Sequence, residues 1–224
     1  MKPLKVLNNY AGIGGNRKLW EDVEVTAIEY DPEIAKVYQD FFPDDKVIVT
    51  DAHQYLLEHF SEFDFIWSSP PCPTHSTLRH LIHANKNKAR FEYPDMRLYQ
   101  EVLILDHWFK GLYCVENVIS YYDPLIKPQK RGRHYYWANF LITPIRVKKE
   151  FNIANTYQTT ADLVGALETR HGITLPEGTK NKEQLLRNCV YPPLGYHILN
   201  CARGNTQKTL AESVNNKTKR INDE

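Results

Sequence analysis

Residues 4–15 read Leu-Lys-Val-Leu-Asn-Asn-Tyr-Ala-Gly-Ile-Gly-Gly, and the fold prediction starts from them. The first four residues form a short apolar run that is typical of a β-strand, and three glycines follow it closely. Glycine lets the backbone turn tightly and approach a ligand, and a helix N-terminus beside such a turn favours a carboxylate or a phosphate. The stretch therefore predicts a strand that ends at a ligand-binding turn, with a plain glycine turn as the alternative.

The chain beyond this turn alternates short apolar runs with helical periodicity. Strands are expected at residues 4–7, 23–28, 47–49, 63–67 and 112–115, and helices at residues 32–42, 53–60 and 98–109. This alternation predicts an α/β fold with a mostly parallel sheet and helices on both faces. Ligands bind beyond the carboxyl ends of such strands, so the residues that end the strands are the candidates for function.

Composition excludes several classes of protein. The 224 residues are 42% hydrophobic and 25% charged, which is typical of one globular domain. The mean hydropathy is −0.53, and no stretch approaches the ~20 apolar residues of a membrane span. The first ten residues are too polar for a signal peptide, so a cytoplasmic location is expected. The four cysteines lie far apart without a CxxC pair, which favours reduced thiols over a disulfide scaffold.

Charge is unevenly distributed along the chain. Residues 1–64 carry 6 Lys and Arg against 13 Asp and Glu, whereas residues 65–150 carry 13 against 7. The basic middle suggests a surface that faces a polyanion such as nucleic acid. Ordinary solvated faces are the alternative.

Two acidic residues end predicted strands next to the glycine turn. Glu29 ends the second strand, where a carboxylate accepts hydrogen bonds from both hydroxyls of a ribose. Asp51 ends the third strand, where it could hold an adenine amino group, or else cap the helix that follows. The glycine turn and the two acids together favour a nucleoside site.

The stretch Ser-Ser-Pro-Pro-Cys-Pro-Thr-His-Ser at residues 68–76 presents Cys72 between prolines at the end of a strand. Such a loop packs poorly in a core and presents a thiol well, so Cys72 is a candidate nucleophile whose pKa basic neighbours should lower. A buried apolar cysteine is one alternative. A zinc site made by Cys72, His75, His80 and His83 is disfavoured, because four ligands within twelve residues would struggle to close a tetrahedron.

Charged residues also surround the fifth predicted strand. Glu116 ends that strand, and burial there would let its carboxyl group donate a proton near neutrality. Arg131 and Arg133 stand two apart, so in one extended strand both would point the same way and could hold a carbonyl oxygen, a carboxylate or a phosphate. A solvated acid and a basic surface run are the alternatives.

These motifs in this order resemble the cytosine-C5 DNA methyltransferase family. Residues 5–16 are similar to its glycine motif, Pro71-Cys72 to its nucleophile motif, and 116–118 to its Glu-Asn-Val motif. Gln129-x-Arg131-x-Arg133 is similar to its QxRxR motif. Residues 188–194 resemble its C-terminal motif, with Arg187 in place of the usual glycine.

The resemblance implies a Rossmann-like methyltransferase fold that binds S-adenosylmethionine and methylates cytosine in double-stranded DNA. Cys72 would attack C6, Glu116 would hold and protonate N3, Arg133 would bind the O2 carbonyl, and Arg131 would support the carboxylate. The implied cofactor-binding residues are Tyr10, Gly12, Gly14, Glu29, Tyr30, Asp51, Pro71 and Asn188. No metal is implied. The cytosine must be flipped out of the base stack before the thiol can reach it.

The resemblance also implies an organisation of the chain. Residues 1–140 would be the catalytic domain, 141–186 a short, irregular target-recognition segment, 187–204 a motif that returns to the catalytic domain, and 205–224 a polar tail. The basic loop after Cys72, with Arg79, Lys86, Lys88 and Arg90, is predicted to close on DNA, a basic surface loop being the alternative.

Few side chains in the target-recognition segment could read bases, which predicts a short or relaxed recognition sequence, or help from another chain. These side chains are Arg146, Lys148, Lys149, Asn152, Asn155, Gln158, Arg170 and His171. A monomer is expected, and a restriction-modification setting is compatible with the sequence. An RNA cytosine methyltransferase and a non-catalytic DNA-binding subunit of the same fold are the two alternative functions.

Overall fold

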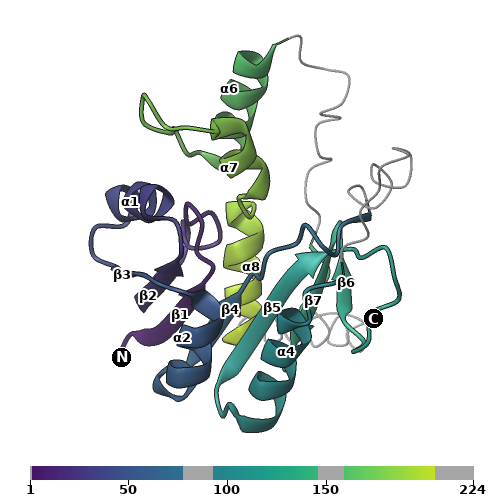
Figure 1. Cartoon of the computed structure of the whole chain (residues 1–224). Coiled ribbons are helices and arrows are strands. Elements are labelled where there is room, and N and C mark those ends of the chain that lie inside the picture. The colour runs from purple at the N-terminus through teal and green to yellow at the C-terminus, as the bar shows by residue number, and fades with distance from the viewer. Residues whose placement is uncertain (1, 78–92, 146–158, 205–224) are drawn as a thin grey trace, which may run out of the picture.

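The computed structural model describes residues 2–77, 93–145 and 159–204, and its centre is one seven-stranded sheet (Figure 1). The strand order is β3-β2-β1-β4-β5-β7-β6, in which the first five strands are parallel and β7 is antiparallel to β5 and β6. The strands are β1 (Leu4–Asn9), β2 (Val23–Glu29), β3 (Lys46–Val49), β4 (Phe65–Ser68), β5 (Leu112–Val118), β6 (Gln129–Arg131) and β7 (His134–Ala138). The predicted mostly parallel α/β fold is confirmed.

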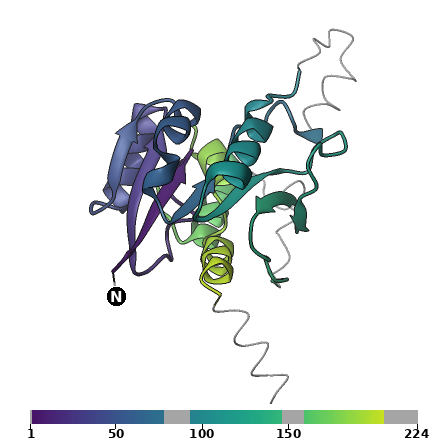
Figure 2. The same cartoon turned by 90° about the horizontal axis from the view of Figure 1, so that it is seen from below.

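Helices cover both faces of this sheet (Figure 2). They are α1 (Pro32–Phe41), α2 (Ala52–His59), the 3₁₀ turn η1 (Phe60–Glu62), α4 (Arg97–Trp108), α6 (Thr160–His171), α7 (Lys182–Asn188) and α8 (Pro192–Ala202). Helices α2 and α4 pack on one face in a cluster that includes Leu56, Val102 and Leu105. Helix α8 packs on the other face, where Ile198 and Leu199 meet side chains of β1, β2 and β4. No helix in the described part of the chain is long and apolar enough to cross a membrane.

The C-terminal helix α8 lies against the turn that follows β1. The indole nitrogen of Trp20 donates a hydrogen bond to the carbonyl of Gly195, 3.1 Å away. A Cβ at Gly195 would stand 2.4 Å from the carbonyl oxygen of Asn16, so only glycine allows the two backbones to approach this closely. The end of the described chain is thereby held beside the first strand.

Helices α6 and α7 form a small helical unit within residues 159–188. Thr159 caps α6 by accepting a hydrogen bond from the backbone nitrogen of Asp162, and Gly172 ends this helix with a φ of 60°. The unit buries Leu163, Leu167 and other apolar side chains against Ile13 of the glycine turn. The expectation of an irregular insertion is therefore wrong for this part of 141–186, because helix caps and a shared apolar cluster order a segment whose own periodicity is weak.

Burial of His171 makes the stability of the helical unit depend on pH. Burial lowers the pKa of His171 from its ordinary 6.5 to about 4. Between pH 6.5 and 4 the unfolded chain therefore binds a proton at His171 that the folded chain does not bind. The contribution of His171 to the free energy of unfolding is full above about pH 6.5 and is lost as the pH falls toward 4. We expect the free energy of unfolding of the wild type to fall by about 2 kcal/mol more over this range than that of His171→Phe.

Urea unfolding at a series of pH values tests this prediction. The exposed His107 provides the control, because His107→Asn should keep the wild-type pH dependence. Parallel curves for the wild type and His171→Phe would contradict the prediction.

Candidate active site

The glycine turn after β1 has the backbone conformation that a ligand cradle needs. Gly12 and Gly14 have φ values of 54° and 78°, in the left-handed region that favours glycine. A Cβ at Gly12 would meet no atom within 4 Å, so the space beside this residue is open. The backbone nitrogen of Gly12 donates a hydrogen bond to Glu29 Oε2 over 2.9 Å, which ties the turn to the end of β2.

The carboxylate of Glu29 and its neighbours suit a nucleoside. Glu29 Oε1 accepts from the backbone nitrogen of Asp31 and Oε2 from that of Gly12, and each oxygen keeps a second lone pair for a ribose hydroxyl. Tyr30 follows with 75% of its surface exposed, which leaves its ring available for stacking. Asp51 caps α2 through a 2.9 Å hydrogen bond from the backbone nitrogen of Gln54, so the helix-cap alternative holds for one of its oxygens. An S-adenosyl group therefore fits the residues at this edge of the sheet.

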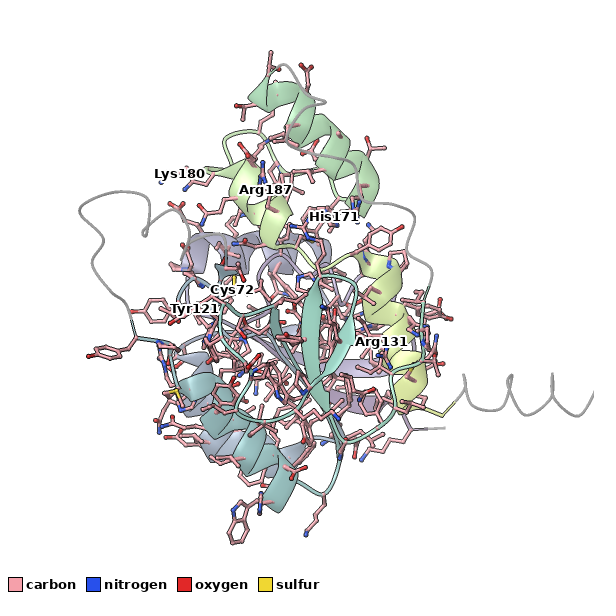
Figure 3. All side chains as sticks on the ribbon, turned by 90° about the vertical axis from the view of Figure 1, so that its right-hand side faces the viewer. Cys72, Tyr121, Arg131, His171, Lys180 and Arg187 are labelled. Carbon is pink, nitrogen blue, oxygen red and sulfur yellow. The ribbon has the colours of Figure 1, made fainter. Side chains whose placement is uncertain are left out.

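The loop that carries Cys72 is held to the segment after β5. The side-chain nitrogen of Asn117 donates to the carbonyl of Pro70 over 3.0 Å, and Ser76 forms a bridge with Ser120. The backbone nitrogen of Tyr121 also donates to the carbonyl of His75, 3.1 Å away. These contacts fix the loop between its two prolines and place Cys72 and Tyr121 on the same side of the sheet edge (Figure 3).

The thiol of Cys72 is not activated by basic neighbours among the residues described. Burial and the nearby Glu116 carboxylate both raise the pKa of the Cys72 thiol from its usual range. The prediction that basic residues lower this pKa is therefore wrong for the described residues. The strand end that presents the thiol also places it beside an acid, whose negative charge disfavours the thiolate. The thiol therefore keeps its proton near neutrality.

Glu116 lies on β5 and is only 9% exposed. Its diagonal neighbour on β7 is His134, whose Nε2 stands 3.4 Å from Glu116 Oε1. The Arg131 guanidinium, which the resemblance assigns to this carboxylate, instead donates to the carbonyls of Ile142 and Lys130. It lies toward α8 in Figure 3.

Arg131 and Arg133 do not share an extended strand, so that expectation is wrong. Strand β6 ends at Arg131, and Gly132 and Arg133 form the two-residue turn into β7. Gly132 has a φ of 58°, which reverses the chain between the two arginines. Arg133 is exposed at the tip of this hairpin.

The C-terminal motif meets the glycine turn. A Cβ at Gly15 would lie 2.2 Å from Cys189 Sγ and 2.3 Å from the carbonyl oxygen of Val190, so glycine permits this contact. Asn188 is the last residue of α7 and is exposed next to this contact, and Pro71 is exposed beside Cys72. The tertiary structure thus brings residues more than 170 positions apart to one end of the sheet.

Several residues predicted to contact nucleic acid are not part of the site described above. His171 is 5% exposed and packs against Tyr191, so it cannot read bases, and Arg170 covers the same ring at 4.9 Å. The following predicted residues lie outside the described part of the chain: Arg79, Lys86, Lys88, Arg90, Arg146, Lys148, Lys149, Asn152, Asn155 and Gln158. His80 and His83 of the disfavoured zinc site also lie there. In the described ranges no group of three or more His, Cys, Asp or Glu side chains is arranged to hold a metal ion.

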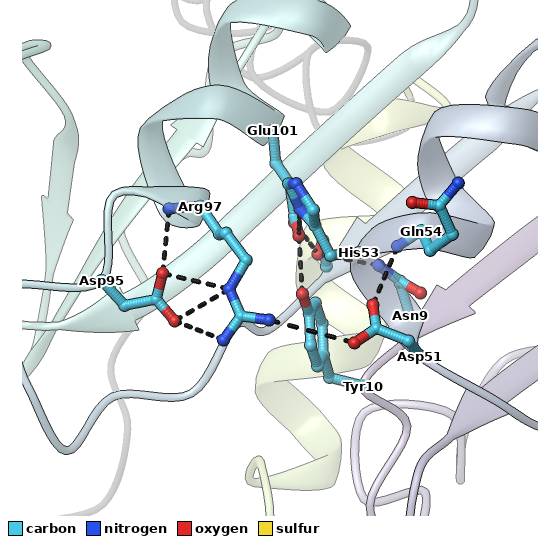
Figure 4. Close-up of polar contacts among 9 residues, drawn as sticks. Asn9, Tyr10, Asp51, His53, Gln54, Asp95, Arg97 and Glu101 are labelled. Carbon is cyan, nitrogen blue, oxygen red and sulfur yellow. Dashed lines mark hydrogen bonds and ion pairs between the residues drawn. The ribbon is translucent and has the colours of Figure 1, made fainter.

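Sequence reasoning missed Glu101, a fully buried carboxylate on α4. Tyr10, His53 and Ser68 all place a polar side-chain atom within 3.0 Å of it (Figure 4). A signal was present, because Glu101 stands on the same helix face as Leu98, Val102 and Leu105. A single charge on an apolar stripe predicts a buried polar contact.

Comparison with known families agrees with this geometry. Residues 4–103 match the sequence profile described as C-5 cytosine-specific DNA methylase. Residues 4–103 are named the methylase segment below, after the family that they resemble. The methylase segment contains the glycine turn, Glu29, Asp51 and Cys72, and it ends within α4. The resemblance seen in the motifs is confirmed over these residues.

Several solved structures are similar to parts of the chain, all with TM-scores of 0.41 or less. A hypothetical protein of Thermus thermophilus has a TM-score of 0.40 at 20% identity, over 61% of this chain and 74% of that chain. The DNMT2 of Spodoptera frugiperda has a TM-score of 0.36 at 24% identity, over 51% of this chain and 35% of that chain. A SAM-dependent methyltransferase of Agrobacterium tumefaciens has a TM-score of 0.32 at 16% identity, over 52% and 39%. No curated protein matches the chain in sequence.

Proposed function

We propose that the chain transfers a methyl group to C5 of cytosine in double-stranded DNA. The observation that carries this proposal is the placement of a thiol and a buried carboxylate at neighbouring strand ends. Cys72 follows β4, Glu116 lies on the paired strand β5, and Asn117 donates a 3.0 Å hydrogen bond to the carbonyl of Pro70. Both groups stand at the edge of the sheet that also carries the glycine turn and Glu29. A methyl donor and a pyrimidine can therefore meet between them.

The residues around the glycine turn would hold the donor. The open space at Gly12 would admit part of the donor, Glu29 would accept from the ribose hydroxyls, and Tyr30 and Asp51 would face the adenine. Pro71 and Asn188 lie at the margins of the same end of the sheet. When bound, S-adenosylmethionine supplies the one-carbon group.

Cys72 and Glu116 would make C5 of cytosine nucleophilic. The Cys72 thiol loses its proton to a base, and its sulfur forms a bond to C6 while the C5–C6 π electrons move toward C5 and N3 takes a proton from Glu116. After methylation a base removes the C5 proton, the C6–S bond breaks as the C5–C6 double bond returns, and N3 gives its proton back to Glu116. Arg133 is proposed to hold O2 of the base, and Arg131 to support Glu116. Arg131 donates to the Ile142 carbonyl in the structure, so this role requires a rearrangement.

Access of the thiol to the ring requires that cytosine leave the base stack, at a cost of a few kcal/mol. The basic loop after Cys72 is proposed to close on the DNA through Arg79, Lys86, Lys88 and Arg90. A monomer in the cytoplasm, working within restriction-modification or a related setting, is the simplest form of the proposal. RNA remains the alternative substrate.

Incubation with tritiated S-adenosylmethionine tests the proposed substrate. We expect tritium in duplex DNA and none in tRNA, and bisulfite sequencing should place the methyl group on cytosine in a short or relaxed sequence context. Transfer to tRNA alone would select the RNA alternative. A strictly methylated site of six or more defined bases would contradict the expectation of relaxed recognition.

A further inference from the structure

Glu101 is a charged side chain with no exposed surface, and its hydrogen bonds join three separate elements (Figure 4). The Tyr10 hydroxyl donates to Oε1 over 2.7 Å, and the Ser68 hydroxyl donates to Oε2 over 2.7 Å. His53 Nδ1 lies 3.0 Å from Oε1. One carboxylate thus connects the turn after β1, the first turn of α2 and the last residue of β4.

The elements that Glu101 connects are those that form the proposed donor site. Tyr10 begins the glycine turn, and His53 lies two residues after Asp51. Ser68 ends β4 beside Asn9, whose side-chain nitrogen donates to the Ser68 hydroxyl over 3.4 Å. Each partner therefore stands next to a residue proposed to bind the donor or the base.

Packing alone does not account for a carboxylate at this position. Burial of an ionised group is unfavourable unless partners compensate it, and a well-packed apolar side chain is often as stabilising as a buried ion pair. The hydrogen bond that the Glu101 carboxylate accepts raises the pKa of His53, which favours a charged partner on α2. The hydrogen bonds of Glu101 therefore serve mainly to fix the positions of the three side chains that it contacts, and contribute less to the stability of the fold.

The first turn of α4 makes a second connection to the same site. Arg97 donates to Asp95 over 2.7 Å and stands 3.9 Å from Asp51. The backbone nitrogen of Asp95 donates to the Thr74 hydroxyl, two residues after Cys72. Residues 97 and 101 lie one helical turn apart, so one face of α4 contacts the donor side, and Asp95 just before this helix contacts the thiol loop.

We propose that Glu101 is a positioning residue for the methyl donor, which acts by holding Tyr10 and the end of β4 in the geometry that binds it. This inference rests on the proposed function, because it assumes that the glycine turn binds the donor. Glu101 itself contacts the three side chains and not the donor. Its loss should therefore weaken donor binding more than it slows the transfer step.

Binding of S-adenosylhomocysteine, measured by calorimetry on the full chain, tests the inference without any need for turnover. We expect Glu101→Gln to raise the Kd about tenfold, while kcat at saturating donor stays within about threefold of wild type. Tyr10→Phe removes only the hydroxyl that contacts Glu101 and should raise the Kd in the same direction. The double variant Tyr10→Phe, Glu101→Gln should have a Kd no higher than that of Glu101→Gln alone, because both substitutions break the same hydrogen bond. Glu58→Gln, at an exposed site on α2, is the matched control and should bind as wild type does.

The outcomes separate the inference from the function on which it rests. If wild type does not bind S-adenosylhomocysteine, the proposed function itself fails. If wild type binds and Glu101→Gln binds within twofold, the inference fails, even where the melting temperature falls. Should Glu101→Gln not fold, Tyr10→Phe and Ser68→Ala decide: a raised Kd in either supports the inference, and wild-type Kd values in both overturn it.

Discussion

Replacement of Cys72 by alanine should lower methyl transfer by a factor on the order of 10⁴ or more, since it removes the sulfur proposed to form the bond to C6. Cys72 is held on its loop by backbone contacts of its neighbours, so loss of the sulfur should leave the fold and the binding of S-adenosylhomocysteine intact. Tritium transfer to duplex DNA under single-turnover conditions measures the effect.

A trapping experiment identifies the bond itself. DNA that carries 5-fluorocytosine cannot lose a proton from C5, so wild-type protein should remain attached to it, and mass spectrometry should find the adduct on residue 72. Cys201→Ala is the control, because that thiol is buried beside Thr143 and His197, away from the sheet edge that holds Cys72. More than a tenth of wild-type activity in Cys72→Ala would overturn the covalent route.

Replacement of Glu116 by glutamine should move two measurements in opposite directions. Loss of the proton donor to N3 should lower kcat by about 10²- to 10⁴-fold. The Glu116 charge also raises the pKa of the Cys72 thiol, so its removal should increase the thiolate fraction and speed alkylation of Cys72 by iodoacetamide at pH 8. A variant that is slower in catalysis yet more reactive at sulfur would separate the two roles of this carboxylate.

The exposed Glu62 supplies the control for this experiment, and Glu62→Gln should leave both rates unchanged. Alkylation must be followed at Cys72 by peptide mass spectrometry, since the chain has four cysteines. Unchanged alkylation together with reduced activity would mean that the two side chains do not interact in solution. Unchanged activity would remove Glu116 from the mechanism.

The fold could be predicted because it follows from patterns among residues that are close together in the sequence. The apolar runs of β1, β2 and β5 have strand length and are separated by helical periodicity, so the parallel sheet follows from patterns that span a few residues each. The candidate residues Glu29, Asp51, Cys72 and Glu116 could be found because each follows or ends a strand. The hairpin of β6 and β7 was missed, since its strands are short and lie at the antiparallel edge of the sheet.

The sequence by itself determined the order of the strands along the chain and the chemical groups at their ends, because both depend on local periodicity and residue type. Only the tertiary structure decided which groups meet. It set Arg131 against a backbone carbonyl and His134 beside Glu116, and it placed a carboxylate from α4 among side chains of three other elements. Long-range contacts of this kind arise from how the elements pack and turn in space, so spacing along the chain does not predict them.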